Sequence, residues 1–334
     1  MPMAGPTPPP WLHFIERPFP SANMVVIAGR HPVLVDSGFG SDFAETERLL
    51  RAAGVPPGRL TLVINTHYHC DHVGGNHGLQ TRYGVPIAAH RWEAAMVNRR
   101  DPEVCSAAWL DHPIEPYSVG RALSDGDEIL AGDTVLRVIH TPGHTLGHIS
   151  LYLPEEQILL CGDAIHGNDV PWISIYREGA GALERAMESL ERLARLPVRW
   201  ACSGHGPAMM QPAAAIETGL RRYERWLTQP EHMGWHACKR IFAYHLMLAD
   251  GMAAADISGY LLGRAWYRDM ARGVFHTEPA EFVAPLLAEM TRSRAATWRD
   301  DRLVATEGYV APPPGWADQI PWPADWPAPT PDAE

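Results

Sequence analysis

Residues 66–76 read THYHCDHVGGN and place three histidines and one aspartate within six consecutive positions. The apolar run 60–65 (LTLVIN) comes just before and predicts a short strand that leads straight into this cluster. Side chains two positions apart on a strand point the same way, so His67 and His69 are able to reach one cation. This stretch therefore predicts one side of a metal site.

The second half of the same stretch supplies ligands for a neighbouring point. Asp71 and His72 follow at once, and the glycine pair at 74–75 lets the backbone turn sharply. Imidazole nitrogens and carboxylate oxygens suit Zn²⁺, with iron or manganese as alternatives. One turn thus presents two histidines to one position and an aspartate with a histidine to the next.

The remaining candidate ligands lie in three later motifs. Each motif follows a predicted strand and carries a glycine beside the candidate ligand: HTPGHT (140–145) with His144, LCGDA (160–164) with Asp163, and SGHGP (203–207) with His205. We expect the ends of these strands to form the floor of a pocket that brings the three candidate ligands together.

Together, the motifs THYHCDH, TPGHT, CGDA and SGHG resemble the metallo-β-lactamase fold superfamily. They occur in that family's order, with gaps of 72, 19 and 42 residues, and VDSGFG (35–40) resembles its early Asp-x-Gly loop. The resemblance covers roughly residues 20–210. It implies an α/β fold, a four-layer αββα sandwich of two mixed sheets.

The resemblance also implies a two-metal site, with two Zn²⁺ as the expected cofactors. A hydroxide shared by the metals would attack a carbonyl carbon, and Asp71 would orient that nucleophile. The implied ligands are His67, His69 and His144 for the first metal, Asp71, His72 and His205 for the second, and Asp163 as the bridge between them.

Several residues near the candidate ligands are not expected to bind metal. His140 and His148 are expected either to support the ligands from behind or to be structural, and Asp36 is expected to form a loop near the site. Cys70 is interpreted as a filler that points away from the metals, with a redox-sensitive thiol as the alternative. Cys161 is interpreted as a buried strand residue.

The bridging Asp163 narrows the reaction class. True β-lactamases of this superfamily generally lack it, whereas glyoxalase II-like thioesterases, lactonases and the phosphodiesterase and nuclease branches resemble this pattern. We therefore expect a metal-dependent hydrolase of a thioester, ester or lactone. The alternatives are a mononuclear iron oxidoreductase similar to the persulfide dioxygenases, and a phosphodiesterase or nuclease.

Two loops are expected to select the substrate. The basic residues that bind glutathione in glyoxalase II are not recognisable in this chain. The aromatic residues of the loops instead suit a partly apolar acyl group. The candidates are Trp109, His112 and Tyr117 in 99–119, His166, Asn168, Trp172 and Tyr176 in 165–177, and Tyr244 and His245 from the helical region.

Hydrophobic periodicity and breaker residues divide the chain into a strand-rich part and a helical part. Strands are expected over 23–29, 32–36, 60–65, 85–89, 134–140, 149–153, 157–161 and 199–203, with helices over 41–53 (capped by Ser41) and 180–196. Further helices are expected over 212–227, 234–249, 253–262, 264–273 and 279–293, followed by a hairpin over 295–306. The expected domains are a proline-rich extension over 1–19, a catalytic domain over 20–210, a helical, winged-helix-like domain over 211–310, and a Pro/Trp-rich tail over 311–334 that either wraps over the body or is disordered.

Composition limits the partners. The net charge is −11, from 28 basic and 39 acidic residues, which disfavours a nucleic-acid partner and leaves a small-molecule substrate. We expect the C-terminal region to cap the site or to form a homodimer contact. Five cysteines without a CxxC pair, no secretory signal and no apolar run of about 18 residues favour a cytoplasmic protein without a membrane span.

Overall fold

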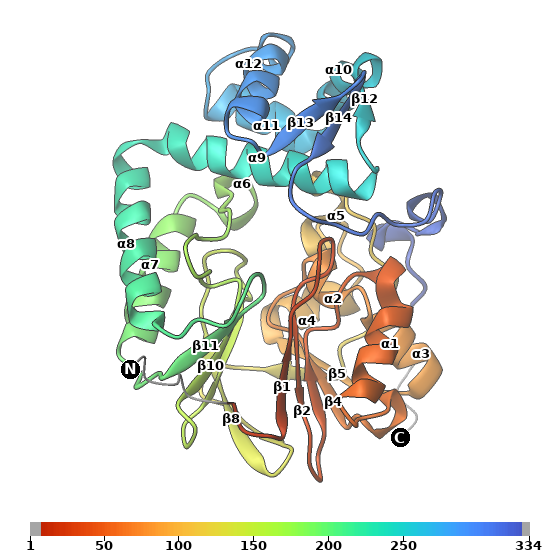
Figure 1. Cartoon of the computed structure of the whole chain (residues 1–334), viewed down its shortest axis with the longest axis vertical. Helices are drawn as coiled ribbons and strands as arrows, with labels where there is room; N and C mark the ends of the chain where they lie inside the picture. Colours follow the sequence, from red (N-terminus) through yellow and green to blue (C-terminus); the bar gives the residue numbers. More distant parts are fainter. Residues whose placement is uncertain (1–7, 329–334) are drawn as a thin grey trace.

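Two mixed β-sheets face each other in the first part of the chain (Figure 1). The computed structural model describes residues 8–328. In the first sheet the strand order is β1-β2-β3-β4-β5-β6, antiparallel from β1 to β3 and parallel from β3 to β6. Its strands are β1 (Leu12–Ile15), β2 (Met24–Ile27), β3 (Val33–Val35), β4 (Leu62–Ile64), β5 (Ile87–His90) and β6 (Arg121–Leu123).

The second sheet has the order β11-β10-β9-β8-β7. Only β10 and β11 run parallel in it. Its strands are β7 (Glu128–Ala131), β8 (Thr134–His140), β9 (Ile149–Leu153), β10 (Ile158–Gly162) and β11 (Trp200–Ser203).

The central strands are apolar on both faces because each face is covered. In β2, Val25 and Ile27 belong to the core between the two sheets, whereas Met24 and Val26 belong to the core under the outer helices. This alternation follows the two-residue period of a strand. It explains why such strands appear in the sequence as short continuous apolar runs.

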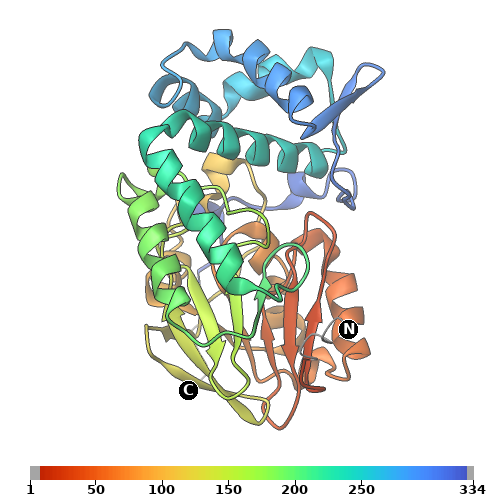
Figure 2. The same cartoon turned by 60° about the vertical axis from the view of Figure 1, so that its left-hand side comes forward.

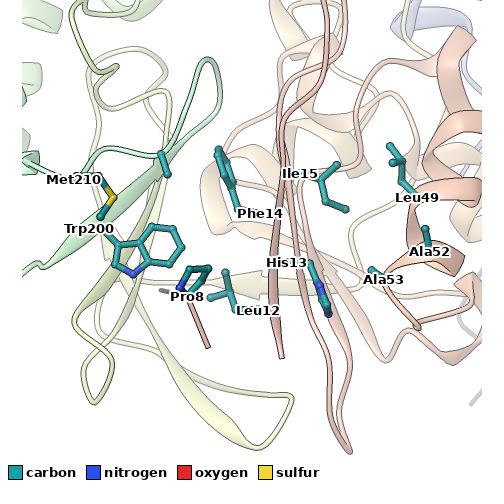
Figure 3. A pocket seen from close by; sticks show the side chains of 11 residues that line it. Pro8, Leu12, His13, Phe14, Ile15, Leu49, Ala52, Ala53, Trp200 and Met210 are labelled. Carbon is teal, nitrogen blue, oxygen red and sulfur yellow. The ribbon is translucent and has the colours of Figure 1, made fainter. Parts of the chain in front are cut away.

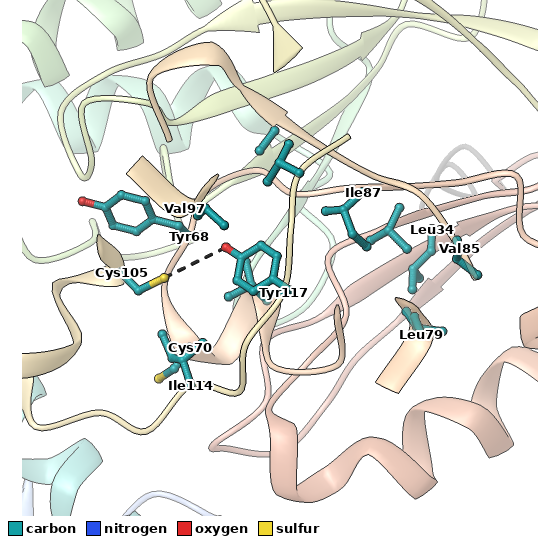
Figure 4. Close-up of a cluster of buried hydrophobic side chains, with 14 of the residues drawn as sticks. Leu34, Tyr68, Cys70, Leu79, Val85, Ile87, Val97, Cys105, Ile114 and Tyr117 are labelled. Carbon is teal, nitrogen blue, oxygen red and sulfur yellow. Dashed lines mark hydrogen bonds between the residues drawn. The ribbon is translucent and has the colours of Figure 1, made fainter. Parts of the chain in front are cut away.

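Helices cover the outer face of each sheet. Those on the first sheet share the hydrophobic core shown in Figure 4: α1 (Phe43–Ala52), α3 (Asn76–Tyr83) and α4 (Arg91–Asn98). Those on the second sheet are α7 (Ala182–Ala194) and α8 (Pro212–Thr228). Three short helices lie in the loops: α2 (Cys70–Val73), α5 (Ala107–Leu110) and α6 (Ile175–Glu178). The predicted four-layer αββα sandwich is confirmed.

The C-terminal region is mainly helical, as predicted. It begins where α8 rises along the second sheet, and the next helix then crosses over the sandwich (Figure 2). A small antiparallel sheet of order β12-β14-β13 accompanies the helices, in keeping with the winged-helix-like expectation. The elements are α9 (Pro230–Leu248), α10 (Ala254–Gly263), α11 (Ala265–Gly273), α12 (Pro279–Arg292), β12 (Met252–Ala253), β13 (Ala296–Arg299) and β14 (Arg302–Ala305). The division after residue 210 stays a prediction, since α8 packs with α7 in the core of the second sheet.

Some local expectations were wrong or incomplete. Ser41 does not cap α1; Asp42 stands at the N-cap, and its side chain makes no capping hydrogen bond. Strands β1, β6 and β7 and helices α3 and α4 were not predicted. The sequence of α3, NHGLQTRY, has no apolar stripe that would predict a helix. This helix is therefore held by its neighbours rather than by an amphipathic face.

The tail folds back onto the catalytic part, one of the two outcomes expected for it. Trp316 packs against Phe39, and the buried Trp326 packs against Tyr117 and under the guanidinium of Arg100. The expectations for the N-terminal extension and the end of the tail fall partly on residues 1–7 and 329–334, which lie outside the described residues. Within residues 8–328, no helix has the length and apolarity needed to cross a membrane.

Replacing the buried tail anchor should destabilise the catalytic part. We expect Trp326→Ala to lower the free energy of unfolding by about 3 kcal/mol, because a large aromatic side chain leaves a cavity. Trp322, which is 44% exposed, is the matched control, and its Ala variant should change stability by less than about 0.5 kcal/mol. Denaturant unfolding measures both, and equal effects would contradict this anchoring role.

Candidate metal centre

The seven predicted ligands meet at one end of the sandwich. Asp163 directly follows β10, His205 lies two residues after its parallel neighbour β11, and His67 follows β4 in the opposite sheet. The two sheets are joined at this edge by a backbone hydrogen bond of 2.8 Å from Ile149 N to Thr66 O. Strand ends from both sheets thus gather these residues, as expected.

Three imidazole nitrogens close around a first point. His67 Nε2 lies 3.0 Å from His69 Nδ1, which lies 2.9 Å from His144 Nε2. All three side chains are buried. This spacing is close to what three ligands of one zinc ion require at Zn–N distances of about 2.0–2.1 Å.

A second point lies beside the first. His205 Nε2 lies 3.1 Å and His72 Nε2 lies 3.7 Å from Asp71 Oδ2. The three side chains form a separate group in which one ligand atom of each lies within 4.8 Å of the others. This is the set predicted for a second metal.

Asp163 lies between the two groups. Its Oδ1 is 3.4 Å from His72 Nε2, and its Oδ2 is 3.7 Å from His144 Nε2 and 3.6 Å from His205 Nε2. One carboxylate thus faces both points, as a bridging ligand must. The structure brings all seven residues together, and their binding of metal stays a prediction.

The unsatisfied atoms of the site fit a cation. His72 Nε2 and Asp163 Oδ1 are buried without a hydrogen-bond partner. Leaving buried polar atoms unpaired costs about 1–3 kcal/mol each. The backbone is also shaped around these atoms, because a Cβ at Gly204 would lie 2.1 Å from Asp163 Oδ1. Bound metal ions would satisfy this donor set.

Electrostatics keep the first group neutral and the carboxylates ionised. Burial and neighbouring imidazoles lower the pKa of His67 and His69, and burial lowers that of His144, so the three rings stay neutral and each keeps one unprotonated nitrogen. Burial alone would raise the pKa of Asp71, but the neighbouring His72 and His205 outweigh burial and lower this pKa to about 2. Ligand atoms in these protonation states are the ones that bind metals.

Three contacts orient the ligands, and the sequence had not indicated any of them specifically. Asp36 Oδ2 lies 2.7 Å from His72 Nδ1, which turns His72 Nε2 toward the centre. His144 Nδ1 donates to the carbonyl oxygen of Trp172 at 2.7 Å. His148 Nε2 accepts a hydrogen bond from the backbone N–H of Asp163 at 3.0 Å, so the structural role expected of His148 is confirmed.

The expected substrate loops contribute unequally. Trp172 stacks on His69, and His166 lies near His205, with its Nδ1 2.7 Å from Ser203 Oγ. Tyr117 is instead buried beside Cys105 in the core of Figure 4, and Asn168 is exposed.

Other candidates lie beside the site or away from it. His112 and Tyr244 contact Cys70 Sγ from behind the metal motif, whereas His245 stacks on Tyr260 within the C-terminal region. His140 stacks on His90 away from the ligands.

The cysteines are not reactive groups. All five are buried and unpaired, and burial raises the pKa of the Cys70 thiol well above its usual range. Cys70 therefore has the properties of an inert filler rather than of a redox-sensitive thiol. Cys161 is buried in β10, as predicted.

An apolar depression of about 520 Å³ lies elsewhere, bordered by α1 and by the edge strands β1 and β11 (Figure 3). Leu12, Phe14 and Trp200 line it together with Met210. It contains none of the seven ligands. The chemistry of this chain is therefore assigned to the metal centre and not to this depression.

A family model described as the metallo-beta-lactamase superfamily matches residues 17–205, which include all seven ligands. The chain belongs to the metallo-beta-lactamase superfamily. The family assignment made from the motifs is thereby confirmed, and the site lies where its four motifs meet.

Similar proteins within this superfamily include named hydrolases. The chain is 30% identical over 156 residues to a hydroxyacylglutathione hydrolase from Maricaulis maris, a match covering 47% of this chain and 52% of that protein. It is 30% identical over 197 residues to the acyl-coenzyme A thioesterase MBLAC2 of Gallus gallus, covering 51% and 68%. The chain spans about half the length of the hydroxyacylglutathione hydrolases that it matches.

A solved structure shares the overall fold, including the C-terminal region. The metallo-beta-lactamase family protein TTHA1429 from Thermus thermophilus superposes with a TM-score of 0.59 at 22% identity. The match covers 89% of this chain and 99% of that one. At this identity the likeness establishes the fold.

Removing the charge behind His72 should weaken metal binding. We expect Asp36→Asn to lower zinc affinity by about 10–100-fold, because the carboxylate fixes the ring and increases its basicity. Competition with a chromophoric chelator measures the affinity. Asp125→Asn, at an exposed ion pair with Arg192, is the control and should bind zinc normally. Unchanged affinity in Asp36→Asn would rule out this orienting role.

Proposed function

We propose that this chain is a dinuclear metal-dependent hydrolase whose substrate is a thioester. The observation that carries the proposal is the convergence of two ligand groups on the shared carboxylate of Asp163. Two metals held a few ångströms apart are typical of enzymes that activate water for hydrolysis. Zinc is the expected metal.

The choice of a thioester is supported by the names of the similar proteins. Hydroxyacylglutathione hydrolase and acyl-coenzyme A thioesterase both describe cleavage of a carbon–sulfur acyl bond. Esters and lactones have the same electrophilic carbonyl and remain related substrates. No contact in the described residues specifically favours the iron oxidoreductase or phosphodiesterase alternatives.

The roles of the residues follow from the geometry. His67, His69 and His144 would hold one ion, Asp71, His72 and His205 the other, and Asp163 both. When bound, the ions would supply Lewis acidity and lower the pKa of a water molecule to near neutrality.

Asp71 is suited to orient the attacking water. Its carboxylate is ionised at neutral pH, and its side chain is 13% exposed. One oxygen faces His205, so the other is available to accept a hydrogen bond from water. Asp71 would therefore hold the water in line with the carbonyl carbon.

Helix α9 crosses over the sandwich near these residues (Figure 1). His236 Nε2 bonds to the carbonyl of Val170 at 3.0 Å, and Tyr244 Oη donates to the carbonyl of Pro20 at 2.9 Å. These two residues and Arg240 are spaced four apart, so they share one face of the helix. These contacts place that face against the loops that follow β10 and β1.

Arg240 gives this face a positive charge. Arg240 and Arg222 both contact the carboxylate of Asp169, so two guanidinium groups share one negative charge. Burial lowers the pKa of Arg240 to about 10, which leaves it protonated at neutral pH. A thioester with an anionic group beyond the reacting carbonyl would be complementary to this charge.

The first test measures metal content and thioester cleavage together. As purified, the chain should contain about two zinc ions and hydrolyse acyl-glutathione or acyl-coenzyme A thioesters. Chelation should abolish the activity, and zinc should restore it. Asp163→Asn should lose at least about 100-fold in kcat and retain less metal, because the shared ligand is weakened.

Other results would redirect the proposal. About one iron per chain, with oxygen consumption on a persulfide, would replace it by the oxidoreductase alternative. Cleavage of bis-p-nitrophenyl phosphate without thioesterase activity would replace it by the phosphodiesterase alternative. Full activity in Asp163→Asn would remove its basis.

The charge on α9 should affect binding more than turnover. We expect Arg240→Met to raise KM for a carboxylate-bearing thioester about tenfold, because a charged hydrogen bond contributes about 1.5 kcal/mol. KM for a neutral thioester of the same acyl group should not change. Lys239→Met is the control, since Lys239 pairs with Glu289 of α12. Equal changes for both thioesters would refute this role for Arg240.

A further inference from the structure

A row of stacked side chains links the C-terminal region to the metal centre. The ring of Trp172 stacks on His69, with centroids 5.3 Å apart and planes 23° apart. Trp109 stacks next to Trp172 at 6.4 Å and 29°. Trp109 Nε1 then donates to Asp269 Oδ2 at 2.7 Å. Asp269 belongs to α11, so the row runs from a ligand of the first group into the C-terminal region.

Trp172 also holds a second ligand of that group. Its carbonyl oxygen accepts the hydrogen bond from His144 Nδ1, and its ring meets the His144 ring edge-on at 5.1 Å. Two of the three ligands in the first group therefore depend on where Trp172 lies. Among the seven ligands, the stacking and hydrogen-bond contacts of Trp172 are with His69 and His144.

The far end of the row is anchored in a hydrophobic core. Trp109 and Leu110 of α5 are buried with Trp266 and Met270 of α11 in the core of the C-terminal region. Within this apolar setting the Trp109 indole has one polar atom, and Asp269 satisfies it. An indole N–H that loses its partner in a core tends to shift toward another partner or to water.

We infer that Asp269 and Trp109 are positioning residues for the first metal position, acting through Trp172 on His69 and His144. This inference rests on the proposed metal centre and gives the C-terminal region a part in building it. Contacts of this kind that orient metal ligands typically change metal affinity by about 10–100-fold. The second position, built from Asp71, His72 and His205, should not depend on the row.

The test is stepwise metal binding to the full-length chain. Zinc affinities for the two positions are measured by chelator competition, and cobalt substitution reports each coordination geometry by its absorption spectrum. We expect Asp269→Ala to weaken one of the two positions about tenfold or more and to alter its cobalt spectrum. Trp109→Phe, which keeps a ring beside Trp172 but has no N–H, should weaken the same position.

Two further variants separate positioning from general loosening. Asp269→Asn keeps an acceptor oxygen for Trp109 and should restore near-normal binding. Arg264→Met breaks the neighbouring link to Asp111, a 2.8 Å hydrogen bond between the same two segments that does not reach Trp172. It should leave both metal affinities unchanged.

The outcomes are distinct. Normal affinity at both positions in Asp269→Ala and Trp109→Phe would overturn the inference while leaving the proposed function intact. An equal loss in Arg264→Met would also overturn it, because the effect would then reflect loosened packing. If the unaltered chain bound no metal, the proposed function itself would fail, and this inference with it.

Discussion

The structure depends on keeping five imidazoles and two carboxylates together in a buried space at the edge of two sheets. Buried polar groups are costly unless they are paired, and two ligand atoms in this cluster, His72 Nε2 and Asp163 Oδ1, have no hydrogen-bond partner. The surrounding residues hold these polar groups in place. Asp36 supports His72, Gly204 leaves room for Asp163, and strand ends from both sheets deliver the remaining groups. Bound metal ions would offset this cost, so the proposed site and the fold that builds it support each other.

The ligand set could be predicted from the sequence because four motifs resemble those of a known superfamily in their order, and each motif follows a strand and carries a glycine. The strand periodicity, the order of the motifs and the helices of the C-terminal region were predictable for the same reason, since each is encoded within a few consecutive residues. Contacts between distant segments were not predictable. Nothing local to Trp172 indicates that its carbonyl meets His144, and Asp36 lies 36 positions before its partner His72. Tyr117 shows the converse error, since an aromatic residue in a candidate substrate loop is in fact buried in the core.

The C-terminal region reaches the catalytic part in three separate places. Helix α9 crosses the centre, α11 holds Trp109, and the tail returns along the first sheet to bury Trp326. These contacts come from segments that are far apart in sequence. The region therefore contributes to the shape of the site, and in the proposed hydrolase the substrate surface would be shared between both parts of the chain.

The short junction of α8 and α9 affects how a substrate would reach the site. A single residue, Gln229, caps the end of α8 and the start of α9, and α8 is packed against α7. At the two ends of its inner face, α9 is fastened to Val170 and Pro20. With a one-residue connection to α8 and these two hydrogen bonds, helix α9 has little freedom to move away from the site. Molecules would therefore enter and leave along the flanks of α9, and an extended thioester would have to thread its chain past the helix before the carbonyl reaches the centre.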